Sequence, residues 1–353
     1  MEMDGNLKLD RHRRMAGLAS LALALALGCG SGDPTPDLGT RAPDGRFAVG
    51  RVRLVLVDEN RGTDAYGALP ATPSRSLRTL VLYPATGSPA DDAKGEPEVR
   101  DDAPPVADRG PFPLFVFAHG YGGVAEVYLD LLASIAAEGY VVAAPDFPVT
   151  STLEPGGFAD FVNQPADASF VIDQVLRLAS AGSGPLAGLV DDSRIGAGGQ
   201  SLGGITTWGL SHQPCCRDAR VGAAIPMAGA ISDFPGSPLD LGEGRALFPG
   251  APFDPVGPPT LVVHGEVDDI VPFASAIEAW SRTAQPRAFL RLPGGDHILP
   301  YVNIGGRTPE LRAVIDASIA FLDLELKREA GASARLRSVA SPGVAELEAE
   351  GID

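Results

Sequence analysis

The chain has 353 residues, of which 44% are hydrophobic and 21% are charged, and its formal net charge at pH 7 is −17. This composition supplies a substantial apolar core and excludes low-complexity disorder for most of the chain. The acidic balance argues against a nucleic-acid partner, because phosphate recognition depends on clustered lysines and arginines.

The first 28 residues have the pattern of a secretory signal peptide. Four lysines and arginines within residues 8–14 precede the uncharged stretch MAGLASLALALALG (15–28). A basic region followed by a short apolar run is typical of exported proteins, and this run is too short to span a bilayer comfortably.

The run ends at Gly28–Cys29, which resembles the box of bacterial lipoproteins, in which the cysteine is lipidated. We therefore expect an exported protein held to the membrane of the cell envelope through Cys29. Ordinary signal cleavage, giving a periplasmic or secreted protein, is the alternative.

Two segments flank the predicted folded domain (46–328). Residues 29–45 are rich in Gly, Pro and Asp and offer nothing to bury, which predicts a flexible tether. Residues 329–353 combine charged side chains with Ala, Ser and Gly. They predict a loosely packed acidic tail with at most one helix.

Between these segments the pattern alternates between apolar strands and helices. An antiparallel pair (51–58 and 78–84) is followed by FPLFVFAH (112–119), a continuous apolar run typical of a strand buried on both faces. Further strands are expected at 140–146, 194–199, 220–229, 259–265 and 287–293, and helices near 124–138, 166–180, after Ser201, near 273–284 and near 308–327. This alternation predicts an α/β fold with a mostly parallel, eight-stranded sheet and helices on both faces.

A Pro- and Gly-rich insertion (232–258) interrupts the alternation. It carries five large apolar residues, Phe234, Leu239, Leu247, Phe248 and Phe253. Two interpretations remain open: a short lid over a site, or a plain surface excursion.

The stretch GAGGQSLGG (196–204) surrounds Ser201 with five glycines. It contains G-x-S-x-G between a predicted strand and a predicted helix. A nucleophile on such a sharp turn has a strained backbone, and Gly199 and Gly203 must be very small because they crowd the turn. The adjacent helix N-terminus favours developing negative charge. The alternative is a glycine-rich turn without chemistry, in a chain that has 43 glycines.

A serine nucleophile needs a base, and the base needs an orienting acid. Among the five histidines, only His297 lies on a glycine-containing loop after a late strand, in GGDHILP. The other four are set aside by position: His12 in the signal peptide, His119 and His264 at strand ends where they shape loops, and His212 about three helical turns beyond Ser201.

Carboxylates for the acid follow a buried strand in HGEVDDIVP (264–272). Asp268 is preferred, with Asp269 as the near rival and Asp233, after the preceding strand, as a more distant one. The chain order Ser201, Asp268, His297 is that of α/β-hydrolases.

An oxyanion would need preorganised N–H donors. The N–H of Leu202, directly after the nucleophile, supplies one. The glycine-rich loop in FAHGYGG (117–123) offers a second, for which Tyr121 is the preferred residue. The Tyr121 ring is also placed to line an acyl pocket.

From about Val49 to Leu326 the chain resembles bacterial serine α/β-hydrolases related to dienelactone hydrolases and platelet-activating-factor acetylhydrolases. The motifs HGYGG, GGQSLGG, HGEVDDIVP and GGDHILP occur in the same order as in that group. The resemblance implies a carboxylic ester hydrolase acting through an acyl-enzyme on a small-molecule or lipid ester, without metal or organic cofactor. It assigns Ser201 as nucleophile, Asp268 as acid, His297 as base, and Tyr121 and Leu202 as oxyanion donors. Dienelactone hydrolases proper have cysteine at the nucleophile position, so lactone specificity is not implied.

Two other functions are considered. GYGGVA also matches G-x-G-x-x-A, with Asp146 after the next strand, as in a dinucleotide-binding unit. The other is a non-catalytic surface lipoprotein on a hydrolase scaffold.

The adjacent Cys215 and Cys216 are expected to be two half-buried thiols, because a disulfide between neighbours closes a strained eight-membered ring.

Overall fold

The structure is a computed structural model that describes residues 45–67, 69–92, 95–152, 157–242, 244–248 and 253–352. The predicted signal peptide, Cys29 and all but the last residue of the predicted tether lie outside the described residues. Every described residue belongs to one compact unit, Asp37–Asp353. Within this part of the chain, no helix is long and apolar enough to cross a membrane.

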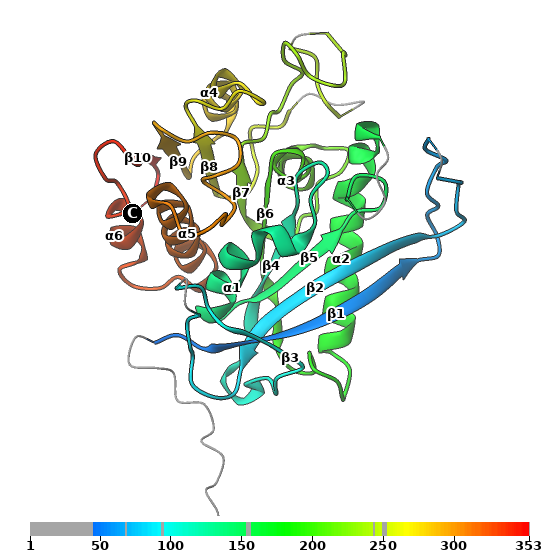
Figure 1. Ribbon diagram of the computed structural model, residues 1–353, viewed down its shortest axis with the longest axis vertical. Coiled ribbons are helices and arrows are strands. Elements are labelled where there is room, and N and C mark those ends of the chain that lie inside the picture. Colours follow the sequence, from blue (N-terminus) through cyan, green and yellow to red (C-terminus); the bar gives the residue numbers. More distant parts are fainter. Residues whose placement is uncertain are drawn as a thin grey trace, which may run out of the picture. The chain divides into compact units, whose positions relative to one another are not determined.

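The described residues form a ten-stranded, mostly parallel sheet (Figure 1). The strand order is β10-β9-β8-β7-β6-β4-β5-β2-β1-β3. The strands are β1 (Ala48–Asp58), β2 (Arg75–Ala85), β3 (Val99–Asp101), β4 (Phe112–Ala118), β5 (Val141–Asp146), β6 (Val190–Gln200), β7 (Val221–Met227), β8 (Thr260–Gly265), β9 (Arg287–Leu292) and β10 (Glu346–Glu350).

The eight strands expected from the sequence are the inner eight of this sheet. Strands β1 and β2 form the expected antiparallel pair, and β2 joins the parallel block β5-β4-β6-β7-β8-β9 by antiparallel pairing with β5. The predicted number of eight is wrong because two short edge strands were not recognised. Strand β3 adds to β1 in parallel, and β10 adds to β9 antiparallel.

Helices cover both faces of the sheet, as predicted. Helices α1 and α5 lie on one face, and α2, α3 and α4 lie on the other (Figure 1). The helices are α1 (Leu129–Ala137), α2 (Gln164–Ala179), α3 (Leu202–His212), α4 (Phe273–Arg282), α5 (Pro309–Leu322) and α6 (Ala332–Arg337). The described residues also form four short helical turns: η1 (Ala107–Arg109), η2 (Ala125–Tyr128), η3 (Phe158–Asn163) and η4 (Asp323–Lys327).

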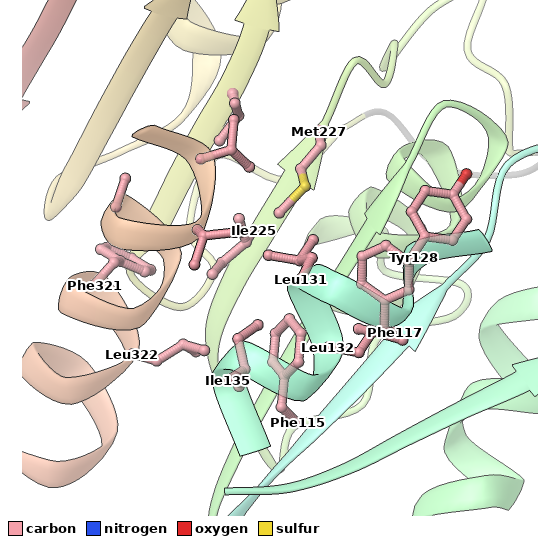
Figure 2. Close-up of a cluster of buried hydrophobic side chains, with 14 of the residues drawn as sticks. Phe115, Phe117, Tyr128, Leu131, Leu132, Ile135, Ile225, Met227, Phe321 and Leu322 are labelled. Atoms are coloured by element: carbon pink, nitrogen blue, oxygen red, sulfur yellow. The ribbon is translucent and has the colours of Figure 1, made fainter. Parts of the chain in front are cut away.

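Side-chain alternation along the central strands builds two apolar layers. In β4, Phe115 and Phe117 face α1, whereas Leu114 and Val116 face α2. Both layers are fully buried, which explains why this strand is a continuous apolar run in the sequence. Figure 2 shows the first layer, in which Leu131, Leu132 and Ile135 of α1 pack with Phe115, Ile225, Phe321 and Leu322.

The C-terminal segment is part of the folded domain, which corrects the prediction of a loosely packed tail after residue 328. Leu336 of α6 is completely buried, and Ala345 and Ile352 are nearly so, all in the same layer as α1 and α5. Strand β10 supplies five residue pairs to the edge of β9. The segment packs on the domain because each of its Leu, Val and Ile side chains is buried or half-buried.

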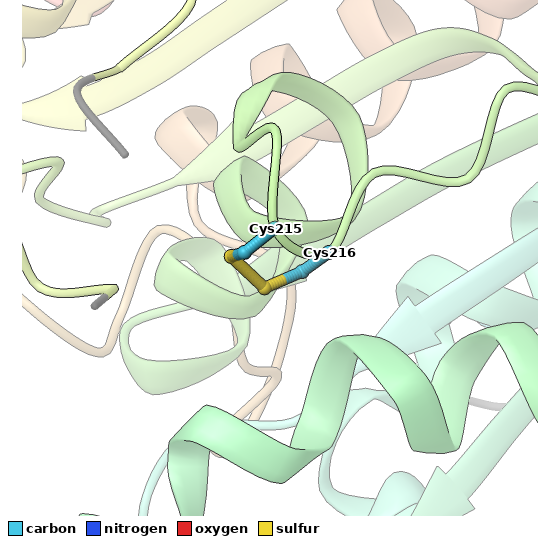
Figure 3. The surroundings of a disulfide bond; sticks show 2 residues. All are labelled: Cys215 and Cys216. Carbon is cyan, nitrogen blue, oxygen red and sulfur yellow. A yellow bond between two sulfur atoms is a disulfide. The ribbon is translucent and has the colours of Figure 1, made fainter. Parts of the chain in front are cut away.

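Cys215 and Cys216 form a disulfide, which corrects the expectation of two free thiols (Figure 3). They lie in a tight turn directly after α3. The N–H groups of Cys216 and Arg217 both donate to the Gln213 carbonyl oxygen, at 2.9 Å each. This turn brings the two neighbouring side chains to one side of the chain.

Candidate active site

Ser201 occupies a sharp turn between β6 and α3. Its backbone has φ 58° and ψ −118°, a left-handed conformation that a residue with a side chain rarely adopts. A Cβ at Gly203 would overlap the Ala118 carbonyl oxygen, and a Cβ at Gly199 would lie 2.6 Å from the same oxygen. The two glycines therefore allow the turn to pack against the end of β4, and the turn holds the Ser201 side chain at the carboxyl end of the sheet.

His297 is within hydrogen-bond distance of Ser201. It lies in the loop after β9 and is 4% exposed. Its Nε2 is 2.8 Å from Oγ of Ser201, and its Nδ1 is 2.7 Å from Oδ2 of Asp268. In this arrangement Nδ1–H donates to the carboxylate, which leaves Nε2 to accept the serine proton.

Asp268 is the carboxylate that the structure brings to His297. Its Oδ1 accepts the N–H groups of Ile270 (2.9 Å) and Val271 (2.8 Å) in the turn after β8. Burial by itself would raise the pKa of Asp268. Hydrogen bonds from His264, from His297 and from the Ile270 N–H outweigh burial and hold the pKa below its usual range. The acid therefore stays ionised beside the imidazole.

The two rival carboxylates lie elsewhere. Asp269 is exposed to solvent. Asp233 is buried within the insertion, where its Oδ2 accepts the Leu241 N–H at 2.7 Å. Neither has a hydrogen bond to His297 among those found in the described residues.

Three further histidines are buried and have structural contacts. His119 Nε2 accepts the Phe147 N–H at 2.9 Å, so its proton is on Nδ1, which donates to the Gly120 carbonyl oxygen at 2.8 Å. His212 stacks on the Phe253 ring, with 5.3 Å between ring centroids. Burial lowers the pKa of both His119 and His212 to about 4, so both are neutral at pH 7.

His264 has a role that the sequence analysis did not recognise. Its Nε2 donates to the Val271 carbonyl oxygen at 2.9 Å and lies 3.3 Å from Oδ2 of Asp268. His264 therefore contacts one carboxylate oxygen while the Val271 N–H contacts the other, and it also bonds the backbone of the turn that holds the acid. The spacing of four residues between His264 and Asp268 is the only signal in the sequence for this contact.

A cavity of about 530 Å³ opens beside Ser201. Both predicted oxyanion donors line it: Leu202 as the first residue of α3, and Tyr121 in the glycine-rich loop after β4. The Tyr121 ring packs near Phe158, with 5.6 Å between ring centroids, and both residues line the cavity. Among the described residues that line this cavity there is no Asp, Glu, Lys or Arg, and their side chains are mainly aliphatic and aromatic.

Part of the 232–258 insertion is a wall of this cavity. Phe234, Gly236 and Pro238 line it. Leu247 and Phe248 are buried beneath, and the Phe248 ring lies 5.3 Å from that of Phe161. The insertion therefore contributes three residues to the cavity beside Ser201.

The geometry does not fit a dinucleotide-binding unit. The glycine-rich loop continues into η2 rather than directly into an α-helix. The Asp146 carboxylate accepts the Ala125 N–H of that same loop at 2.8 Å, instead of facing an open ribose site.

Among the described residues, no group of three or more His, Cys, Asp or Glu is arranged to hold a metal ion.

Comparisons with known proteins agree with this architecture. Residues 94–160 match the family model of platelet-activating factor acetylhydrolase, isoform II. The matched segment includes the glycine-rich loop with β4, α1 and β5, but not Ser201, Asp268 or His297. No curated protein matches the sequence.

Solved structures decide the fold. A ferulic acid esterase from Streptomyces cinnamoneus superposes with a TM-score of 0.57 at 21% sequence identity, over 82% of this chain and 93% of that chain. The chain has the α/β-hydrolase fold. Because 1068 solved chains match, the fold alone names no substrate.

Two other polar residues near Ser201 were missed by the sequence analysis. Gln200 and Tyr128 are buried in the cavity wall and hydrogen-bonded to each other at 2.8 Å. Gln200 occupies the first variable position of G-x-S-x-G, so the sequence already shows that it is next to the nucleophile. Nothing in the sequence indicates Tyr128.

Proposed function

We propose that this protein is a serine hydrolase that cleaves carboxylic esters through an acyl-enzyme. The observation that carries the proposal is the unbroken hydrogen-bonded series Ser201 Oγ, His297 Nε2, His297 Nδ1 and Asp268 Oδ2 at the edge of an apolar cavity. The partial match to an acetylhydrolase family and the likeness to a ferulic acid esterase support it. An intact series of this kind also disfavours a non-catalytic scaffold.

The reaction follows from the roles of these atoms. His297 Nε2 takes the Ser201 proton as Oγ bonds to the ester carbonyl carbon, and the carbonyl oxygen becomes an oxyanion. The N–H groups of Leu202 and Tyr121 are the proposed donors to that oxyanion. The alcohol then leaves with the proton from His297, and water repeats the sequence to release the acid. Ionised Asp268 stabilises the imidazolium at each step.

The cavity walls point to a neutral ester with an apolar acyl or alcohol group. The described lining residues include no Asp, Glu, Lys or Arg, so they offer a charged substrate no compensating charge for the hydration that it would lose. The substrate class is therefore a small-molecule or lipid ester without charge next to the ester bond.

A panel of p-nitrophenyl esters with acyl chains of graded length tests the function. We expect turnover of neutral esters by the wild type. We also expect no turnover above background for Ser201→Ala at unchanged melting temperature, because the hydroxyl is essential to chemistry and minor in packing. Ester hydrolysis by Ser201→Ala at a rate near that of the wild type would contradict the proposal.

We further propose that the protein is exported and anchored through Cys29. This rests on the basic and apolar pattern of residues 8–28 and on Gly28–Cys29. A lipoprotein amino terminus carries several acyl chains, each adding roughly 0.8 kcal/mol of binding per buried CH₂. Mass spectrometry of the mature N-terminus from a bacterial host should find lipidated Cys29, and Cys29→Ser should lack the lipid. An unmodified N-terminus beyond residue 29 would contradict the anchor and leave the hydrolase proposal intact.

A further inference from the structure

Gln200 bridges two loops that meet at the nucleophile. Its side chain is 2% exposed. Nε2 donates to the backbone carbonyl oxygen of His297 at 2.8 Å, and Oε1 accepts the Tyr128 hydroxyl at 2.8 Å. Because the His297 carbonyl only accepts, the orientation of the Gln200 amide is determined, and Tyr128 must be the donor at the other end.

Tyr128 continues the chain of hydrogen bonds to the glycine-rich loop. Its oxygen accepts the Gly120 N–H at 3.1 Å while its proton goes to Gln200. Burial raises the pKa of Tyr128 to about 12, so the hydroxyl keeps this proton at neutral pH. The series therefore runs in one direction from Gly120 N–H, through the Tyr128 hydroxyl, to Gln200.

The next peptide of the same loop carries the proposed oxyanion donor. The Gly120 carbonyl oxygen accepts from His119 Nδ1 at 2.8 Å and from the Gly123 N–H at 2.9 Å. A trans peptide is planar, so a fixed Gly120 carbonyl also fixes the Tyr121 N–H, which points the opposite way. A Cβ added at Gly120 would lie 3.3 Å from the Ser201 Cβ, which shows how closely the loop approaches the nucleophile.

We infer that Gln200 and Tyr128 are positioning residues for the proposed ester hydrolysis. They fix the distance between two loops on either side of Ser201: the glycine-rich loop, which carries the Tyr121 N–H, and the loop that carries His297. Neither side chain is needed for proton transfer. The inference rests on the proposed function and deepens it, because it explains how donor and base stay aligned during the reaction. A displacement of about 1 Å at such a site costs on the order of 100-fold in rate.

Two variants test this role, Tyr128→Phe and Gln200→Met. The first keeps the ring that packs at 4.9 Å from Phe117, and the second keeps the side-chain length. With a neutral p-nitrophenyl ester, we expect kcat to fall by about 10- to 100-fold and KM to change by less than about 3-fold, since substrate binding is retained and alignment is lost. The double variant should lose no more than the more damaged single variant, because both changes break one series.

Tyr83→Phe is the matched control. Tyr83 is a buried residue of β2, and its hydroxyl donates to the Ala103 carbonyl oxygen at 2.9 Å. It is not among the residues that line the cavity. The variant should lower the melting temperature about as much as Tyr128→Phe while leaving kcat within about 2-fold of wild type.

The outcomes separate the inference from the proposed function. An active wild type with both variants within about 2-fold of its kcat would overturn the inference alone. So would losses that add fully in the double variant, or a loss of kcat in Tyr83→Phe as large as in Tyr128→Phe. A wild type that hydrolyses no ester would overturn the proposed function, and the inference with it.

Discussion

Asp268 uses both oxygens of its carboxylate at the candidate site. One accepts two backbone N–H groups in the turn after β8, and the other faces His297 and His264. Asp233 has none of these contacts, although it also follows a strand of the sheet. The turn after β8 therefore determines where the acid lies. Its contacts keep the carboxylate ionised and within hydrogen-bond distance of the His297 imidazole.

Asp268→Asn should lower turnover of a neutral ester by roughly 10³- to 10⁴-fold, because the imidazolium loses its stabilising charge and the required tautomer. The fold should persist, since asparagine still accepts the two backbone N–H groups through its side-chain oxygen. Kinetics on purified variants check this, with Asp269→Asn and Asp233→Asn as matched controls whose activity stays near wild type. A crippled Asp233→Asn beside an active Asp268→Asn would place the acid after β7 instead.

The central residues of the site could be predicted because each leaves a local pattern. Ser201 lies in G-x-S-x-G, and His297 remains once position excludes the other histidines. Gln200, Tyr128 and His264 could not be assigned. Their roles depend on contacts across the fold, such as the 72 residues that separate Tyr128 from Gln200. A single buried tyrosine or glutamine has no periodicity that would reveal such a partner.

Strand β10 shows why an edge element escapes sequence analysis. Three of the five residues in its sequence, ELEAE, are glutamates, a pattern that is typical of a solvent-exposed segment. In the structure, Leu347 and Ala349 pack against the core layer. Glu350 and Glu346 form ion pairs across the strand with Arg287 (2.8 Å) and Arg291 (3.4 Å) of β9. Charged residues are common on edge strands, where they prevent pairing with other chains.

Leu336→Ala should destabilise the protein by about 2–5 kcal/mol, because it empties a fully buried position in the layer shared with α1 and α5. Glu348→Ala, at an exposed position of β10, is the control and should change stability by less than about 0.5 kcal/mol. Urea unfolding curves measure both. Equal stabilities of Leu336→Ala and wild type would show that the C-terminal segment is a loose tail after all.

The alternation of strands and helices along the chain was enough to predict the fold class. Apolar runs such as that of β4 mark strands covered on both faces, and helices between them require parallel pairing. The strand order was not readable from periodicity, since local patterns do not state which strands are neighbours. The order matters for the site, because it places the ends of β6, β8 and β9 at one edge, where Ser201, Asp268 and His297 meet.

A fluorophosphonate probe tests directly whether Ser201 is a catalytic nucleophile, because the residue that it modifies can be located. We expect one stoichiometric adduct on Ser201, found by peptide mass spectrometry, because the proposed base His297 makes this serine nucleophilic and the probe resembles the tetrahedral intermediate. Ser201→Ala should remain unlabelled, and Asp268→Asn should react far more slowly than the wild type. An unlabelled wild-type protein that is folded, or an adduct on any other residue, would show that Ser201 is not the nucleophile.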